Sequence, residues 1–169
     1  MSDNLFLRKP MISDLPQMLS WENDLKKNQY TDFPVNYTSS QIENFLNSEH
    51  DLLLHNQVRY TLELNSFAVG CVDLYDYDVV NARAGVGIYV DVKFRNRGLA
   101  SKSLKLLKSI SNERYLISNL YADIMSENKV SIKIFENADF IKNGLKKNWI
   151  RTENSFQDVF FYQCSLIKI

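Results

Sequence analysis

Apolar and polar residues alternate with period two in Val58–Leu64, and after the polar pair Asn65-Ser66 a second apolar stretch follows in Phe67–Tyr75. This pattern predicts two half-buried strands joined by a tight turn. A third stretch, Val86–Val90, is rich in β-branched and aromatic residues. The pattern therefore predicts three consecutive strands that pair antiparallel.

Four other segments carry apolar residues at helical spacing. They predict helices from Ser13 towards Leu25, after Thr38, from about Gly98 to Asn112, and from Asn128 to about Glu136. Thr38 and Gln41 have the spacing of a capping box, and Phe33-Pro34 predicts a turn between the first two helices.

Four more strands complete the pattern. They are predicted at Phe6–Arg8, Leu120–Ile124, Phe140–Trp149 and Val159–Leu166. The order of elements predicts an α/β protein in which helices cover both faces of one mixed, mostly antiparallel sheet of about seven strands. A length of 169 residues fits a single domain over residues 1–169.

Composition limits the classes of partner. The chain carries 20 basic and 20 acidic side chains, so no net charge favours nucleic acid or an anionic membrane. Cys71 and Cys164 lack the spacing of a zinc or redox motif, so neither a metal site nor a disulfide is predicted. Met1–Leu5 lacks the features of a secretion signal, and no apolar run reaches membrane length. We therefore expect a cytoplasmic protein.

The change from strand to helix falls at Arg95–Gly98. A helix that begins there has unpaired N–H groups and a dipole that favours an anion, and Arg95 and Arg97 add positive charge. This arrangement predicts a phosphate-binding turn. The alternative is a solvated helix start with two exposed arginines.

The segment Asn128–Phe140 joins a polar helix start to an aromatic end, one strand after the basic turn. Taken alone, Asn128 is a good N-cap, and Phe135 and Phe140 are good core residues. The position of the segment relative to the basic turn favours a functional interpretation.

With these two segments the chain resembles the GCN5-related N-acetyltransferase (GNAT) family. Arg95–Ala100 is similar to that family's pyrophosphate loop: a basic or amide residue, two residues, a glycine, one residue, then a glycine or alanine. Asn128–Phe140 is similar to its second motif. Within the family, the chain is most similar to the branch of ribosomal-protein alanine acetyltransferases and spermidine acetyltransferases. The residues that carry this similarity are Asn81–Gly85, Asn128–Ser131, Gly144, Gln157-Asp158 and Tyr162.

The resemblance implies a GNAT fold with about four helices, a V-shaped splay beside the central strand, and acetyl-CoA as cofactor. Backbone groups of the central strand would pair with the pantetheine arm, and the basic turn would hold the pyrophosphate. The implied cofactor residues are Ile88, Tyr89, Val90, Arg95, Asn96, Arg97, Gly98, Leu99, Ala100, Ser101, Asn128, Ser131 and Lys133.

The resemblance also raises the question of the catalytic groups. Phe135 stands where many family members have a tyrosine as general acid, and Gly85 stands where a glutamate is often found. Ser131 is the substitute expected for the acid, because it lies one helical turn before Phe135. Asp73, acting through water, and Tyr89 are the other catalytic candidates, while Tyr162 is a further tyrosine in reach of the site.

The implied reaction is transfer of an acetyl group to a primary amine. Acidic residues in the first helices and on the hairpin suit a cationic amine such as a polyamine, and a peptide N-terminus competes equally. A homodimer is compatible with the family. The alternatives are a non-catalytic acyl-CoA-binding or regulatory domain, and an interaction domain that has kept only the fold.

Overall fold

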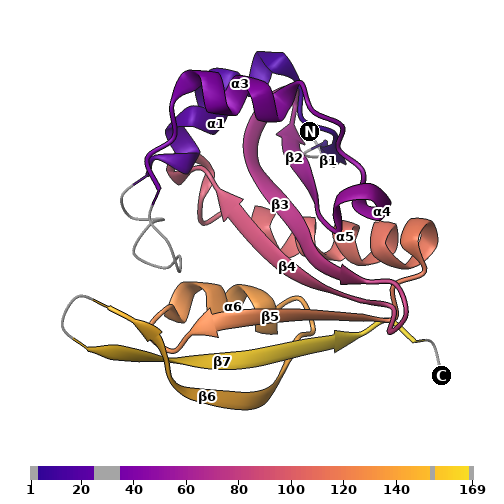
Figure 1. Ribbon diagram of the computed structural model, residues 1–169, viewed down its shortest axis with the longest axis vertical. Helices are drawn as coiled ribbons and strands as arrows, with labels where there is room; N and C mark the ends of the chain where they lie inside the picture. The colour runs from indigo at the N-terminus through magenta and orange to yellow at the C-terminus, as the bar shows by residue number, and fades with distance from the viewer. Residues whose placement is uncertain (1–3, 25–34, 153–154, 168–169) are drawn as a thin grey trace.

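One twisted sheet of seven strands, in the order β1-β2-β3-β4-β5-β7-β6, organises the chain (Figure 1). The computed structural model describes residues 4–24, 35–152 and 155–167. The strands are β1 (Leu5–Arg8), β2 (Val58–Leu64), β3 (Phe67–Asp78), β4 (Arg83–Val90), β5 (Asn119–Met125), β6 (Ile141–Arg151) and β7 (Phe156–Ser165). The predicted α/β class and the seven-stranded mixed sheet are confirmed.

All neighbouring strands pair antiparallel except β4 and β5, which are parallel. That parallel pairing covers three positions, from Arg83 opposite Asn119 to Gly85 opposite Tyr121. Beyond them β4 continues to Val90 and β5 to Met125 without pairing to each other, and Figure 1 shows the two strands diverging. The V-shaped splay expected from the resemblance is confirmed.

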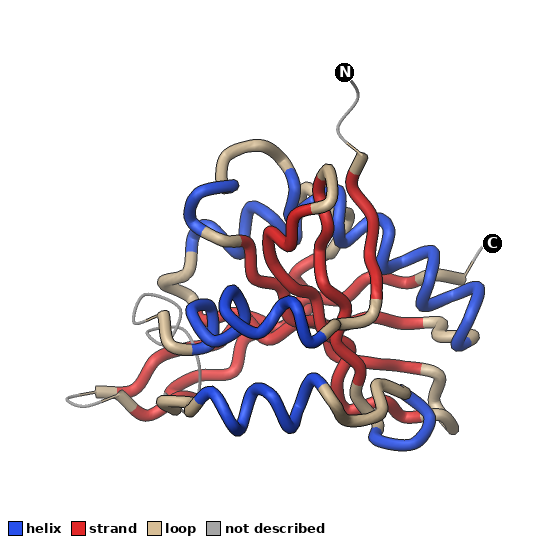
Figure 2. The backbone as a smooth tube through the Cα atoms, turned by 90° about the horizontal axis from the view of Figure 1, so that it is seen from above, coloured by secondary structure: helices blue, strands red, loops and turns tan. Residues whose placement is uncertain are grey.

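Helices cover both faces of the sheet, as predicted (Figures 1 and 2). In the described residues they are α1 (Leu15–Glu22), α3 (Ser39–Leu46), α4 (Leu52–His55), α5 (Leu99–Tyr115) and α6 (Lys129–Glu136), with 3-10 turns at Ile12–Asp14 and Val92–Phe94. Apolar side chains of α5 and α6 pack with β2 to β5 and β7 in the larger core. A smaller core joins α1 and α3 on the other face, through Met18, Trp21, Ile42 and Leu46.

The two predicted helix starts near the N-terminus differ in outcome. The capping box at Thr38 is confirmed: Thr38 Oγ1 accepts from the Gln41 amide at 3.3 Å, and Gln41 Oε1 accepts from the Thr38 amide at 2.9 Å. At the first helix, Asp14 does not cap with its side chain. Its carboxylate instead accepts from Arg8 at 2.7 and 2.8 Å, and Ser13, where the helix was expected to begin, lies in the preceding 3-10 turn.

Several boundaries also differ from the prediction. The described part of α1 ends at Glu22, α5 runs three residues further than expected, to Tyr115, and α4 was not predicted. Only Leu52 of the three consecutive leucines in α4 is buried, which leaves no helical stripe to recognise. The predicted turn at Phe33-Pro34 and the expected helix end at Leu25 lie outside the described residues.

Candidate active site

The edge of β4 that faces the splay is the first part of the site. From Val86 to Val90, β4 pairs with β3 along one edge only. An unpaired strand edge presents N–H and C=O groups that an extended chain with amide groups can bind as an added strand. Ile88, Tyr89 and Val90 lie on this segment and are half-buried, as a site for a pantetheine arm requires.

The turn after β4 leads into the N-terminus of α5. Gly98 is its N-cap and has a left-handed backbone, with φ at +71°. The first bond inside the helix runs from the Lys102 amide to the Gly98 carbonyl at 3.1 Å, so the amides of Leu99, Ala100 and Ser101 have no acceptor within the helix. Together with the helix dipole, these amides suit an anion such as a pyrophosphate.

The basic side chains of this turn are exposed. The Arg97 guanidinium lies 5.4 Å from the centre of the Phe94 ring. Arg95 turns back along β4: its Nε donates to the Val90 carbonyl at 2.9 Å, and its guanidinium lies 5.6 Å from the centre of the Tyr89 ring. Arg95 therefore joins the phosphate turn to the strand edge.

Helix α6 lies beside the first turn of α5, which it meets near its own C-terminal end. Asn128 caps α6, since its Oδ1 accepts from the Ser131 amide at 3.0 Å. Ser101, in the first turn of α5, has its Oγ 3.5 Å from the Ile134 carbonyl of α6, while Lys133 is exposed. Because β4 and β5 are parallel, the predicted cofactor residues gather at the carboxyl ends of the two strands, where the V is open.

The two departures from the family pattern have structural counterparts. Phe135 is buried, and its ring packs edge-on against Phe140 at 5.0 Å, so it is a core residue with no proton to give. Gly85 lies under Tyr75: a Cβ at Gly85 would stand 2.3 Å from Tyr75 Cε2. No larger side chain fits there unless the Tyr75 ring moves.

The Asp73 carboxylate is held by Arg59. Arg59 donates from Nε and Nη2 to the two carboxylate oxygens at 2.7 and 2.8 Å, and from Nη1 to Glu22 at 2.6 Å. Burial alone would lower the pKa of Arg59, but the charges of Asp73 and Glu22 and the hydrogen bonds to Asp73 act together against it, and the pKa lies above its ordinary value. No sequence motif marks Arg59, whose charge compensates Asp73.

Two tyrosines named from the sequence have their hydroxyl groups engaged. Tyr89 donates to Asp24 Oδ2 at 2.9 Å, and burial together with this carboxylate raises the pKa of Tyr89. Tyr162 is buried in the larger core and donates to Glu136 at 2.9 Å, and burial raises its pKa to about 12. Both hydroxyl groups are protonated at neutral pH.

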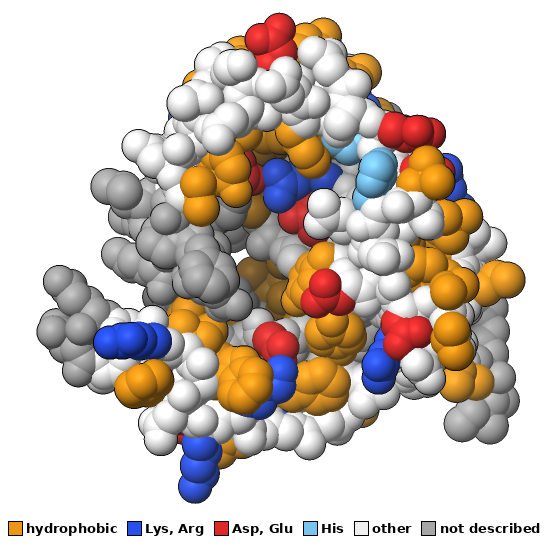
Figure 3. Space-filling view, in the orientation of Figure 1, with side chains coloured by type: hydrophobic (Ala, Val, Ile, Leu, Met, Phe, Trp, Pro, Cys, Tyr) orange, Lys and Arg blue, Asp and Glu red, His pale blue; other side chains and the backbone are white. Residues whose placement is uncertain are grey.

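The face that carries α1 and α3 is hollowed, and acidic and basic side chains lie together inside the hollow (Figure 3). Asp73, Tyr89 and Arg59 come from three adjacent strands below these helices. The face opposite α5 and α6 is thus the open side of the splay, from which an acceptor can approach.

Comparison with known proteins identifies the family. Residues 4–141 match the acetyltransferase (GNAT) domain family. The chain is 23% identical over 170 residues to the uncharacterized N-acetyltransferase p20 of Bacillus licheniformis, covering 99% of this chain and 94% of that protein.

Solved structures agree on the fold. Spermidine N-acetyltransferase of Vibrio cholerae, in complex with CoA and spermine, has a TM-score of 0.84 at 18% identity, covering 96% of this chain and 95% of that one. RimL, a ribosomal-protein alpha-N-acetyltransferase in complex with coenzyme A, has a TM-score of 0.83 at 21% identity, covering 95% and 93%.

The chain belongs to the GNAT acetyltransferase family. It is an N-acetyltransferase that uses acetyl-CoA, and the predicted family, enzyme class and cofactor are confirmed. No helix in the described residues is long and apolar enough to cross a membrane. Cys71 and Cys164 are buried, and neither forms a disulfide within the described residues.

Proposed function

We propose that this chain transfers the acetyl group of acetyl-CoA directly to the primary amine of a polyamine, a small amine or a peptide N-terminus. The observation that supports this most is the free edge of β4 beyond Gly85, which runs between a phosphate-binding turn and an open face. The donor lies along the edge, and the acceptor enters from the face of α1 and α3.

The donor site uses the predicted residues. Backbone groups of Ile88–Val90 pair with the amides of the pantetheine arm, and the amides of Leu99, Ala100 and Ser101 bind the pyrophosphate. Arg95, Asn96, Arg97 and Gly98 shape and charge the turn. Asn128 orders the start of α6, and Lys133 stands towards the 3′-phosphate end of the cofactor.

The chemistry needs proton movements at two atoms. The acceptor must lose a proton to become nucleophilic, because an alkylammonium has a pKa of about 10. Its nitrogen then attacks the thioester carbonyl and gives up a second proton, the C–S bond breaks, and the departing thiolate takes up a proton. Ser131 donates that proton in place of Phe135. Asp73, through water, and Tyr89 remain the candidates on the acceptor side.

A thiol-release assay tests the function. The protein is incubated with acetyl-CoA and, in turn, spermidine, amino acids, aminoglycosides and short peptides, and free CoA is measured. We expect release that depends on the acceptor. CoA binding without turnover across the panel would favour the non-catalytic acyl-CoA-binding alternative. Sedimentation equilibrium tests the homodimer.

A further inference from the structure

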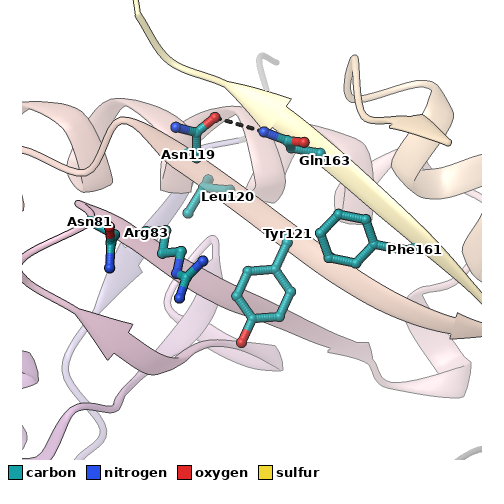
Figure 4. Close-up of a pocket in the computed structure, with 7 residues that line it drawn as sticks. All are labelled: Asn81, Arg83, Asn119, Leu120, Tyr121, Phe161 and Gln163. Carbon is teal, nitrogen blue, oxygen red and sulfur yellow. Dashed lines mark hydrogen bonds between the residues drawn. The ribbon is translucent and has the colours of Figure 1, made fainter. Parts of the chain in front are cut away.

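A recess of about 270 Å³ lies on the sheet where β4, β5 and β7 meet, away from the residues assigned to the donor (Figure 4). It is lined by Asn81, Arg83, Asn119, Leu120, Tyr121, Phe161 and Gln163. Arg83 begins β4 and Val90 ends it, so about 23 Å of strand separates the recess from the phosphate turn. The recess is therefore not part of the CoA phosphate site.

Hydrogen-bond donors face this recess. One nitrogen of Arg83, Nη2, lies 3.1 Å from Asp78, and the Arg83 side chain is 56% exposed, so other guanidinium N–H groups are open to a ligand. Asn119 supplies a second donor. Its Oδ1 accepts from Gln163 at 2.9 Å, which leaves its amide nitrogen on the side away from Gln163 (Figure 4).

A ladder of amides fixes the direction of the Asn119 side chain. Asn143 on β6 donates to Gln163 Oε1 at 3.1 Å, and Gln163 on β7 donates in turn to Asn119 on β5. Among the described residues, no protein acceptor pairs with the Asn119 amide nitrogen. A donor held in advance loses little conformational entropy when it binds an oxygen.

An apolar wall connects the recess to the point where β4 and β5 separate. The rings of Tyr121 and Phe161 stack with centres 5.8 Å apart and planes at 26° (Figure 4). Tyr121 lies opposite Gly85, the last paired residue of β4, and Gly85 is two residues, or about 7 Å, from Arg83. A short acceptor can span this distance.

We propose that the recess binds the carboxylate of the acceptor, so that the preferred acceptor is a short peptide or amino-acid-like amine with a free carboxylate. The proposal rests on the proposed function and specifies its substrate class. Asp76, whose carboxylate lies 3.4 Å from the hydroxyl of Tyr121, attracts the ammonium end, and Arg83 and Asn119 take the other end. A polyamine has no oxygen for these donors and meets the positive charge of Arg83.

The test uses a series of oligoglycines from glycine to tetraglycine, each as the free acid and as the C-terminal amide, with spermidine for comparison. The readout is the ratio of kcat/KM for acid over amide. We expect the ratio to rise with length to about tenfold, the effect of a charge-assisted hydrogen bond in a partly exposed site. Arg83→Met should return the ratio to about one.

Asp78→Asn is the matched control, because it removes the same ion pair and leaves Arg83 in place. A ratio at or above the wild-type value in Asp78→Asn supports the proposal, whereas a loss equal to that of Arg83→Met overturns it. If Arg83→Met does not fold, Asn119→Asp, which is nearly isosteric, should also lower the ratio.

The outcomes separate this proposal from the proposed function. Turnover with an acid-to-amide ratio of one, or a preference for spermidine, overturns the recess assignment and leaves the transferase intact. If no acceptor releases CoA, calorimetry with triglycine in the presence of CoA still tests whether the recess binds a carboxylate. Equal affinity of the acid for wild-type protein and Arg83→Met then overturns it.

Discussion

At the level of single side chains, the proposed role of Ser131 as proton donor can be tested directly, because Phe135 is buried against Phe140 and has no proton to donate. Ser131→Ala should lower kcat by roughly a hundredfold, the usual contribution of a general acid, with little change in CoA affinity. The cap of α6 survives the substitution, since Asn128 accepts from the backbone amide of Ser131. Steady-state kinetics and calorimetry with CoA measure the two effects.

Ser109→Ala on the exposed face of α5 is the control for this change, because it removes the same hydroxyl far from the start of α6. It should behave as wild type. If Ser131→Ala keeps full kcat, the hydroxyl of Ser131 is a surface group, and the proton comes from elsewhere.

A second prediction concerns Asp14. Burial alone would raise the pKa of Asp14, but hydrogen bonds from Arg8 and the Met11 amide outweigh it and hold the pKa below its usual range. A lowered pKa means that the carboxylate stabilises the fold above the unfolded-state pKa of about 4 and loses this contribution as pH falls through the folded-state value. Asp14→Asn should therefore cost about 2 kcal/mol at pH 7.

Urea unfolding between about pH 7 and pH 3 checks this prediction. The difference in the free energy of unfolding between wild type and Asp14→Asn should stay constant in the upper part of the range and shrink at the acid end. A difference that is independent of pH would show that Asp14 acts through its shape and not through its charge.

The departures at Phe135 and Gly85 could be read from the sequence, but the Arg59 clamp could not. A regular hairpin around Asn65-Ser66 places Arg59 opposite Val72. In the structure a bulge follows the pair Glu63 and Ala68, so that Leu62 lies opposite Gly70 and Arg59 lies opposite Asp73. One unpaired residue moves every later pair, and the local alternation of apolar residues carries no sign of it.

At the level of elements, the strand-to-helix turn depends on Gly98. No atom lies within 4 Å of a Cβ placed there, so the constraint is the left-handed backbone and not space. Asparagine and aspartate both tolerate this conformation and have nearly the same shape. Gly98→Asp should bind CoA at least tenfold more weakly than Gly98→Asn, because a carboxylate would face the pyrophosphate.

Calorimetry with CoA measures that ratio, and thermal unfolding of both variants confirms that each remains folded. Equal affinities of the two variants for CoA would show that Gly98 does not lie at the pyrophosphate site and that the turn is a solvated helix start. The comparison isolates charge, because the backbone strain is common to the two variants.

Elements with a strong period were predictable, and short or irregular ones were not. The long helix α5 and the hairpin of β2 and β3 follow from their apolar spacing. The four-residue helix α4 exposes two of its three leucines, Leu53 and Leu54, so it lacks a buried stripe. At the first helix, Asp14 pairs with Arg8 of β1, a contact between two elements that the local apolar pattern does not show.

At the level of the whole molecule, the splay connects the two sequence motifs. The basic turn and the Asn128 segment are separated by α5 and β5 in the chain. The three-residue parallel contact of β4 with β5 puts both of them after the carboxyl ends of neighbouring strands, and Ser101 of α5 meets Ile134 of α6. The order of elements predicted a mixed sheet. The point at which β4 and β5 separate depends on side chains, such as Tyr75 over Gly85 and Tyr121 opposite Gly85. Those contacts join distant parts of the chain.

Because this site is built from both halves of the sheet, its occupation should stabilise the whole fold. CoA at about a hundred times its Kd should add about 2.7 kcal/mol, which raises Tm by roughly 5 to 11 °C for a chain of this size. Differential scanning calorimetry at increasing CoA measures the shift. Adenosine, which lacks the pyrophosphate and the pantetheine arm, is the control ligand, and Gly98→Asp is the control protein. An unchanged Tm in millimolar CoA would mean that the chain keeps the fold without binding its cofactor.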